Sequence, residues 1–275
     1  MAENITAENV TLDDELRITA PEDSLPPISL DRLPEHMQDA CARAGWSRLM
    51  PVQAHALPYL MAGRDIMVQS RTGSGKTGAY LLPLLSLLDP EEKKPQALIL
   101  APTRELAMQI HKDALELGVF TDLKTVVVFG GMDHETQRRS LDCPLDVLVG
   151  TPGRIIDYSR SGALDLSQVE ILVIDEADRM LDMGFIPDVR RIMGYLPDKN
   201  KRTTMLYSAT LDETVMRLAS NWMEEPFKAE VESETNATDT VKQVVYVIQA
   251  KDKFTVLYNH IALHPAARTI VFCNR

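Results

Sequence analysis

The chain has 275 residues, of which 45% are apolar and 25% charged, which excludes a collagen, a coiled coil or a wholly disordered protein. Its net charge is −11, and the first 40 residues, with ten acidic and two basic side chains, contribute −8 of it. This balance excludes a protein that holds nucleic acid through a general basic field, but it allows a local nucleic-acid site.

Cysteine usage and hydropathy favour a cytoplasmic location. Cys41, Cys143 and Cys273 are odd in number and far apart, which is typical of a reducing compartment. The sequence contains no run of 18 apolar residues, and its N-terminus lacks the basic and apolar regions of a signal peptide. We therefore expect a cytoplasmic protein without a membrane span.

The N-terminal part of the chain changes character near residue 28. Residues 1–27 are polar and acidic and contain three prolines, which predicts a disordered tail. Apolar residues then recur at helical spacing from Leu30 to Ala44, and Gly45 is a stop signal. A second helix is predicted from Pro51 to about Gly63.

Beyond residue 64, short β-rich segments alternate with helical ones. The predicted strands are apolar throughout, as expected when helices cover both faces of a sheet, and occupy 65–69, 97–101, 125–129, 147–150, 171–174 and 204–207. Helices are predicted between them, for example over 75–88, 104–117, 133–141 and 187–196. The alternation predicts an α/β fold in which helices flank a doubly wound parallel sheet.

The pattern changes again near Pro226, so the first domain is predicted to span 28–228. Residues 229–240 are polar and predict a linker. Beyond it, strands over 241–248 and 269–272 and a helix near 252–263 predict the start of a second domain over 241–275. Because 35 residues are too few for a domain, we expect the second domain to be incomplete in this chain.

The clearest chemical signal is Ser70-Arg-Thr-Gly-Ser-Gly-Lys-Thr77, between a predicted strand and a predicted helix. Glycines there let backbone N–H groups point at phosphate, Lys76 can reach the terminal phosphates, and the Thr77 hydroxyl can ligate Mg²⁺. An ordinary glycine-rich turn is the alternative, and Gly-Lys-Thr in this context favours a phosphate-binding loop. The predicted nucleotide-binding residues are Ser70, Arg71, Thr72, Gly73, Ser74, Gly75, Lys76 and Thr77.

A second signal is the apolar strand 171–174 followed by Asp175-Glu176-Ala177-Asp178. Ligands of open α/β sheets bind at the C-terminal edge, where Asp175 can hold Mg²⁺ on the phosphates and Glu176 can orient and deprotonate a water. Taken without the phosphate-binding loop, this segment would be interpreted as a solvent-exposed acidic turn. Together with the phosphate-binding loop it predicts nucleotide hydrolysis, with Lys76, Asp175 and Glu176 as catalytic residues.

Asp175-Glu176-Ala177-Asp178 also spells the signature of the DEAD-box ATP-dependent RNA helicases, and further segments resemble motifs of that family in the right order. They are Gly45-Trp46 with Pro51-Val52-Gln53 (Q motif), 70–77 (motif I), 102–107 (motif Ia), Gly130-Gly131, 151–154 (motif Ib), Ser208-Ala209-Thr210 (motif III) and 271–274 (start of motif IV). The resemblance covers roughly 28–275. It implies a RecA-like fold of the P-loop NTPase type, ATP and Mg²⁺ as cofactors, and ATP hydrolysis coupled to RNA unwinding or RNA–protein remodelling.

The resemblance implies that Gln53 recognises adenine, for which a side-chain amide is suited. A buried or helix-capping glutamine is the alternative. The aromatic residue that the family usually places 17 positions before the glycine, where it stacks on adenine, is Ile28 here. Leu49 and Met50 replace the usual Pro and Thr of the motif. We therefore expect weaker adenine binding, or looser base selectivity, than is usual in the family.

The same resemblance implies contacts to the RNA backbone, because Arg pairs with phosphate and Gly permits close approach. Such contacts are independent of base sequence, and contacts to 2′-hydroxyls would favour RNA over DNA. The residues are Arg104, Gly131, Thr151, Gly153 and Arg154. These segments are also compatible with a helix N-terminus capped by Thr103 and with a Pro-Gly turn at 151–154.

Coupling between the nucleotide and RNA sites is implied for Ser208 and Thr210, with Asp178 as their partner. The alternative for Thr210 is a plain helix N-cap, because Thr210-Leu-Asp-Glu213 is a capping-box pattern.

The expected activity of the 275 residues by themselves is limited. Motifs V and VI, whose arginines stabilise the transferring phosphate in the family, have no counterpart here, and such arginines contribute roughly 10³–10⁵-fold in rate. We therefore expect the chain alone to bind nucleotide, to hydrolyse it very slowly and not to unwind RNA. Two alternatives are a non-catalytic nucleotide-gated RNA-binding or scaffold module and a helicase that acts on DNA.

Overall fold

The computed structural model describes residues 24–70, 73–92, 94–230, 244–265 and 268–273. Most of the predicted tail, most of the predicted linker, and Arg71 and Thr72 of the predicted phosphate-binding loop lie outside these residues. The chain divides into two compact units, Met1–Glu232 and Ser233–Arg275. Each unit is described by itself below.

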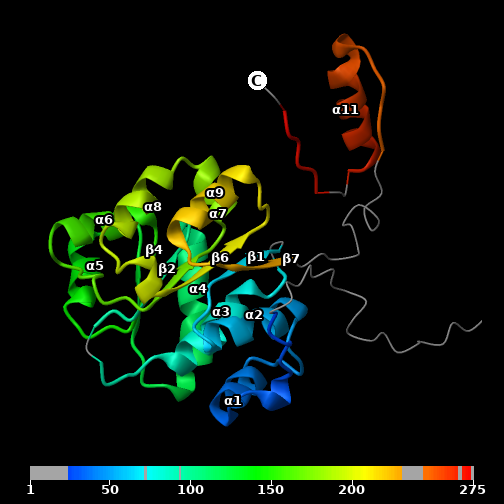
Figure 1. Ribbon diagram of the computed structural model, residues 1–275. Helices are drawn as coiled ribbons and strands as arrows, with labels where there is room; N and C mark the ends of the chain where they lie inside the picture. The colour runs from blue at the N-terminus through cyan, green and yellow to red at the C-terminus, as the bar shows by residue number, and fades with distance from the viewer. Residues whose placement is uncertain (1–23, 71–72, 93, 231–243, 266–267, 274–275) are drawn as a thin grey trace, which may run out of the picture. The chain divides into compact units, whose positions relative to one another are not determined.

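A seven-stranded parallel sheet forms the centre of the first unit (Figure 1), which confirms the predicted fold class. Its strand order is β3-β4-β2-β5-β6-β1-β7, and every neighbouring pair is parallel. The strands are β1 (Ile66–Gln69), β2 (Ala97–Leu100), β3 (Thr125–Val128), β4 (Val147–Gly150), β5 (Ile171–Ile174), β6 (Thr203–Ser208) and β7 (Phe227–Glu230). All six strands that the sequence predicted are present, and each begins and ends within one residue of the predicted position.

Strand β7 was not expected from the sequence. Its residues, Phe-Lys-Ala-Glu, alternate between buried and half-buried and form no continuous apolar run. Strand β7 lies at the sheet edge, beside β1. The strand ends at Glu230, inside the segment 229–240 that was predicted to be a linker.

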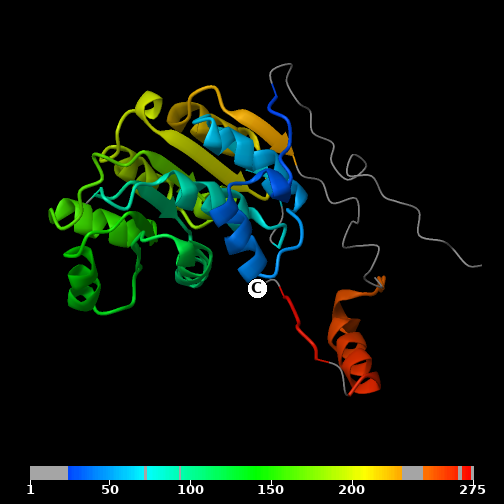
Figure 2. The same cartoon turned by 90° about the horizontal axis from the view of Figure 1, so that it is seen from below.

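Helices cover both faces of the sheet (Figures 1 and 2). Because successive strand residues point to opposite faces, Ile66 and Val68 pack into one core cluster and Met67 packs into the other. The first cluster receives side chains from α1 (Glu35–Arg43), α2 (Pro51–Met61), α3 (Lys76–Leu87) and α4 (Arg104–Leu117). The second receives them from α6 (Pro152–Arg160), α7 (Ala177–Asp182), α8 (Ile186–Met193) and α9 (Glu213–Trp222).

Shorter elements complete the first unit. Helix α5 (His134–Leu141) contacts β3, and single 3₁₀ turns occur at η2 (Leu30–Arg32), η3 (Gly118–Phe120) and η4 (Lys199–Lys201). The first predicted helix therefore begins later than its apolar spacing indicated, at Glu35, because Pro34 holds Leu33 in an extended conformation. Among the described residues, no helix is long and apolar enough to cross a bilayer.

The described part of the second unit contains η5 (Ala250–Asp252) and α11 (Lys253–Leu263), which corresponds to the helix predicted near 252–263. The two predicted strands are wrong over their described residues, 244–248 and 269–272, which form no strand. Val247 and Phe272 are 98% and 92% exposed. Strands gain their stability from paired neighbours and a covered face, and these segments have neither among the described residues.

Candidate functional site

The carboxyl ends of the parallel strands bring the predicted site residues to one edge of the sheet. The glycine-rich loop follows β1, Asp175 follows β5, and Ser208 ends β6. Arg104, Gly131 and Thr151 lie just after β2, β3 and β4. Because the strand order places β5, β6 and β1 side by side, and likewise β3, β4 and β2, this edge has two halves with different residues.

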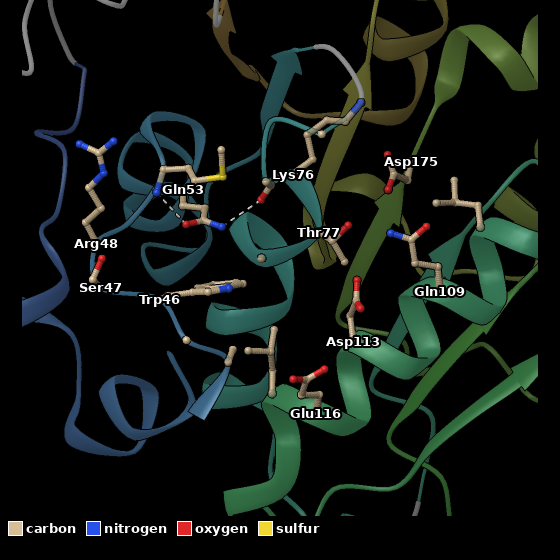
Figure 3. A pocket seen from close by; sticks show the side chains of 18 of the residues that line it. Trp46, Ser47, Arg48, Gln53, Lys76, Thr77, Gln109, Asp113, Glu116 and Asp175 are labelled. Atoms are coloured by element: carbon tan, nitrogen blue, oxygen red, sulfur yellow. Dashed lines mark hydrogen bonds between the residues drawn. The ribbon is translucent and has the colours of Figure 1, made fainter. Parts of the chain in front are cut away.

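A cleft of about 690 Å³ opens over the β1-β6-β5 half (Figure 3). Its walls come from the loop between α1 and α2, the glycine-rich loop, the start of α3, one face of α4, and Asp175 with Glu176. The cleft therefore brings together the segments that the sequence predicted to bind nucleotide.

Two glycines shape the loop between β1 and α3. Gly73 and Gly75 have φ of +82° and +89°, a conformation that favours glycine. A Cβ at Gly73 would meet nothing within 4 Å, whereas one at Gly75 would lie 2.6 Å from Sδ of Met50. Since α3 begins at Lys76, its N-terminal N–H groups lie beside this open turn, which is a geometry suited to phosphate.

Lys76 is a buried cation at the start of α3. The residue is only 7% exposed, and its Nζ donates a hydrogen bond to the carbonyl of Ser70, 3.0 Å away. Within the described part of the chain it forms no ion pair with a carboxylate. A buried charge is costly unless it is paired, so this position suits an anionic ligand.

Asp175 is 2% exposed, and both of its carboxylate oxygens accept hydrogen bonds. Tyr80 Oη donates to Oδ2 at 3.0 Å, and the Glu176 N–H donates to Oδ1 at 2.9 Å. Burial raises the pKa of Asp175, whereas the charge of Lys76 and these two hydrogen bonds lower it. Burial and the nearby carboxylate raise the pKa of Tyr80 well above its usual value, so Tyr80 stays a proton donor.

The residues present fit Mg²⁺ that arrives with a nucleotide. Asp175 and Thr77 both line the cleft and offer the hard oxygen ligands that Mg²⁺ prefers (Figure 3). Among the described residues there is no group of three or more His, Cys, Asp or Glu side chains that could hold a metal ion. The ion would therefore need phosphate oxygens and water to complete its coordination.

Glu176 lines the same cleft in an unusual backbone conformation. Its φ and ψ are 51° and 53°, the left-handed region that costs energy for a residue with a side chain. Its Oε2 pairs with Nη1 of Arg179 at 3.0 Å, and its side chain is 14% exposed. The turn thus holds the Glu176 carboxylate in the cleft, beside Asp175. This position is compatible with the predicted role of Glu176, which is to orient a water.

Gln53 is almost completely buried and joins the Q motif to the glycine-rich loop. Its Oε1 accepts from the N–H of Met50 at 2.8 Å, and its Nε2 donates to the carbonyl of Gly75 at 3.2 Å (Figure 3). The alternative of a buried, helix-capping glutamine is therefore what the structure shows. Gln53 also lines the cleft, so adenine recognition stays a prediction compatible with this position.

Ile28 lies beside α2, next to Gln53 in the chain's fold, and its predicted contact with the base stays a prediction. It is half-buried against the first core cluster, its N–H donates to the carbonyl of Ala54, and it is not among the residues that line the cleft. The aromatic residue in the cleft is Trp46, whose ring packs so closely on α3 that a Cβ at Gly78 would lie 2.3 Å from Cη2. The Gly45-Trp46 pair before Pro51 was its only sequence signal.

The structure brings Asp178 together with both predicted coupling residues. Its N–H donates to Oγ of Ser208 at 3.2 Å, and its Oδ2 accepts from the N–H of Thr210 at 3.2 Å. The capping alternative for Thr210 is wrong, because Asp212 is the N-cap of α9 and its side chain accepts from two N–H groups there. The role of these contacts in coupling stays a prediction.

On the β3-β4-β2 half, the predicted RNA residues gather around one loop. Arg104 begins α4 after its N-cap Thr103, as the helix-terminus interpretation expected. A Cβ at Gly131 would lie 3.7 Å from Nη1 of Arg104, and Nη2 of Arg154 donates to the carbonyl of Met132 at 3.4 Å. Thr151 is the N-cap residue of α6 and makes no side-chain capping hydrogen bond; its N–H donates to the carbonyl of Val128 of β3 at 3.1 Å. A Cβ at Gly153 would meet nothing within 4 Å.

Sequence reasoning missed two buried residues that position this loop. Gln137 forms two hydrogen bonds with the backbone of Phe129, at 2.8 and 3.0 Å. Tyr158 Oη donates to the carbonyl of His134 at 2.8 Å and accepts from Arg154 at 3.3 Å. No motif spacing marks either residue, because each acts through a partner that only the fold brings near.

Comparisons with known proteins agree with this geometry. A family model described as DEAD/DEAH box helicase matches residues 50–218. The ATP-dependent RNA helicase RhlB of Pseudomonas putida is 42% identical over 252 residues, which are 89% of this chain and 63% of that protein. RhlB of Pseudomonas aeruginosa is 44% identical over 239 residues, which are 84% of this chain and 60% of that protein.

A solved structure has the same fold. The DEAD box protein from the hyperthermophile Methanococcus jannaschii superposes with a TM-score of 0.69 at 31% identity, and the match covers 84% of this chain and 61% of that chain. The chain therefore spans less than two thirds of the length of each of these relatives.

Proposed function

This chain belongs to the DEAD/DEAH box helicase family, and on that premise we propose that it is the ATP- and RNA-binding part of a cytoplasmic ATP-dependent RNA helicase. One observation carries the proposal: Lys76, Thr77, Asp175 and Glu176 line a single cleft at the end of β1 and β5. The similarity to proteins named ATP-dependent RNA helicases supports the substrate and the reaction.

In this proposal the nucleotide phosphates lie on the glycine-rich loop and the N-terminus of α3. Lys76 exchanges its hydrogen bond with the Ser70 carbonyl for the terminal phosphates, and Thr77 and Asp175 hold Mg²⁺. Held there with the nucleotide, Mg²⁺ would supply positive charge to the phosphate oxygens. Glu176 orients the attacking water and accepts its proton.

RNA binds on the neighbouring β3-β4-β2 half through its backbone. Arg104 and Arg154 are partly or fully exposed and can pair with phosphates, while Gly131 and Gly153 leave room for close approach. Asp178 links two neighbouring strand ends on the β1-β6-β5 half, because it follows Asp175 by three residues and contacts the segment that ends β6. Movement of Asp175 and Glu176 around a nucleotide is thereby transmitted to Ser208 and Thr210.

Hydrolysis by the 275 residues alone is expected to be very slow. In the family that this chain resembles, arginines of motifs V and VI complete the phosphate site, and the 275 residues contain no counterpart of these motifs. We therefore expect ATP binding without RNA unwinding from this chain.

The direct test is equilibrium binding of a fluorescent ATP analogue in Mg²⁺, with wild-type chain and Lys76→Ala. Removing one charged contact raises Kd by about 10- to 100-fold, whereas Lys112→Ala, an exposed lysine on α4, leaves Kd unchanged. Equal affinity of the wild-type chain and Lys76→Ala would contradict the proposed site. ATP-driven strand separation by the wild-type chain would contradict the expected inactivity.

A further inference from the structure

We propose that Tyr80 is a positioning residue for Asp175, which it holds in the orientation that receives Mg²⁺ with the nucleotide; this inference rests on the proposed function. The observation is a hydrogen bond of 3.0 Å from Tyr80 Oη to Oδ2 of Asp175. Both residues are almost completely buried, with exposures of 0% and 2%. The hydrogen bond is therefore shielded from water. Hydrogen bonds are stronger in the protein interior than in water.

The bond fixes the one carboxylate oxygen that the neighbouring backbone leaves unrestrained. Oδ1 of Asp175 already accepts from the Glu176 N–H at 2.9 Å. With Tyr80 on Oδ2, both ends of the carboxylate are held, so its plane cannot rotate freely. An ionised carboxylate has about four acceptor sites, and the remaining ones stay available to water molecules around the ion. Groups that orient a metal-binding carboxylate in this way raise metal affinity.

Tyr80 is itself held rigidly. It follows Lys76 by one turn of α3, so the two side chains start from the same face of the helix. Its ring packs at 5.2 Å from the ring of Tyr207 on β6, with an angle of 57° between the planes. A side chain locked by packing can position its partner more accurately than a mobile one.

Tyr207 provides a matched control inside the same cluster. It is as buried as Tyr80, but its hydroxyl has no hydrogen-bond partner among the described residues. Replacing Tyr207 by Phe removes an unsatisfied polar group, whereas Tyr80→Phe removes the contact to Asp175 and keeps the ring. The two variants therefore separate the hydroxyl's effect on Asp175 from a general effect on packing.

The experiment is a Mg²⁺ titration of fluorescent ATP-analogue binding by the 275-residue chain, with wild type, Tyr80→Phe, Tyr207→Phe and Lys76→Ala. Thermal unfolding confirms that each variant is folded. We expect Tyr80→Phe to raise the Mg²⁺ concentration at half-saturation about tenfold. Tyr207→Phe should keep the wild-type midpoint. In an Asp175→Asn background, Tyr80→Phe should have no further effect, because the two residues act as one unit.

Each other outcome identifies what has failed. A wild-type Mg²⁺ midpoint for folded Tyr80→Phe, or an equal shift for Tyr207→Phe, would overturn the positioning role and leave the proposed function intact. An undiminished effect of Tyr80→Phe in the Asp175→Asn background would overturn it as well. If the wild-type chain shows no Mg²⁺-dependent binding, or if Lys76→Ala binds equally well, the proposed function itself is wrong.

Discussion

At the scale of single residues, the site depends on side chains that connect loops while they face a ligand. The side chain of Gln53 hydrogen bonds to both Met50 and Gly75. The side chain of Asp178 accepts from the N–H groups of Ala209 and Thr210, while its backbone N–H donates to Ser208. Both side chains keep further donors or acceptors that these hydrogen bonds do not use. A ligand that engages the remaining donors and acceptors would therefore act on the backbone of distant segments.

Gly78 gives the sharpest stability prediction at this scale. A methyl group there would lie 2.3 Å from Cη2 of Trp46 and 2.6 Å from Nε2 of Gln53, although alanine is otherwise favoured in helices. We expect Gly78→Ala to lower the free energy of unfolding by about 1–3 kcal/mol, because the well-packed junction of α3 with the 44–53 segment must shift. Chemical denaturation measures this change. A variant as stable as wild type would show that Trp46 packs elsewhere.

The sequence predicted the residues whose chemistry is local and missed those that act through the fold. Lys76, Asp175 and Glu176 were recognisable because each lies in a short motif at the end of an apolar strand. Tyr80 and Gln137 were not, because the fold alone brings Tyr80 of α3 to Asp175 after β5 and packs α5 beside β3. The resemblance assigns Ile28 to the base site; its side chain is half-buried against the core, and its contact with a base stays a prediction.

At the scale of elements, the order of the strands determines which chemistry lies next to which. Six strands were predictable because a parallel strand covered on both faces is a continuous apolar run. Strand β7 was missed because its residues, Phe-Lys-Ala-Glu, alternate and form no apolar run. The strands of the second unit were wrong because an apolar segment without a partner forms no ladder. Apolar patterning predicts a strand only where a neighbour is present to pair with it.

Helix α6 carries a prediction that separates folding from RNA binding. Gly153 lies in its first turn, is exposed, and has open space where a Cβ would be. Gly153→Ala should therefore raise stability by about 0.5–1 kcal/mol, because alanine favours a helix over glycine. If the RNA backbone approaches closely here, the same methyl group should weaken RNA binding.

Fluorescence anisotropy with labelled single-stranded RNA, beside thermal unfolding, measures both effects of Gly153→Ala. If Gly153→Ala is stable and binds RNA with unchanged affinity, the RNA backbone does not approach Gly153 closely. Loss of stability would mean that the space beside α6 is filled.

At the scale of the whole first unit, one sheet carries two chemically different halves at the same edge. The nucleotide residues follow β1 and β5, the predicted RNA residues follow β2, β3 and β4, and β6 ends at Ser208 between β5 and β1. The acidic balance of the chain is compatible with the proposed RNA binding, because a few arginines and open glycines on one half would be enough for the contacts. We therefore propose that the two ligands bind to different halves of one edge.

The measurement that tests this claim most directly is hydrogen–deuterium exchange of the chain with Mg²⁺ and ATP, and separately with saturating single-stranded RNA. ATP should slow exchange in 73–78, 175–178 and 208–210, while RNA should slow it in 102–107, 129–134 and 151–154. Unchanged exchange rates in 73–78 and 175–178 with ATP would contradict the proposed nucleotide site. Protection of those two segments by RNA, with no protection of 102–107, 129–134 and 151–154, would contradict the proposed RNA site.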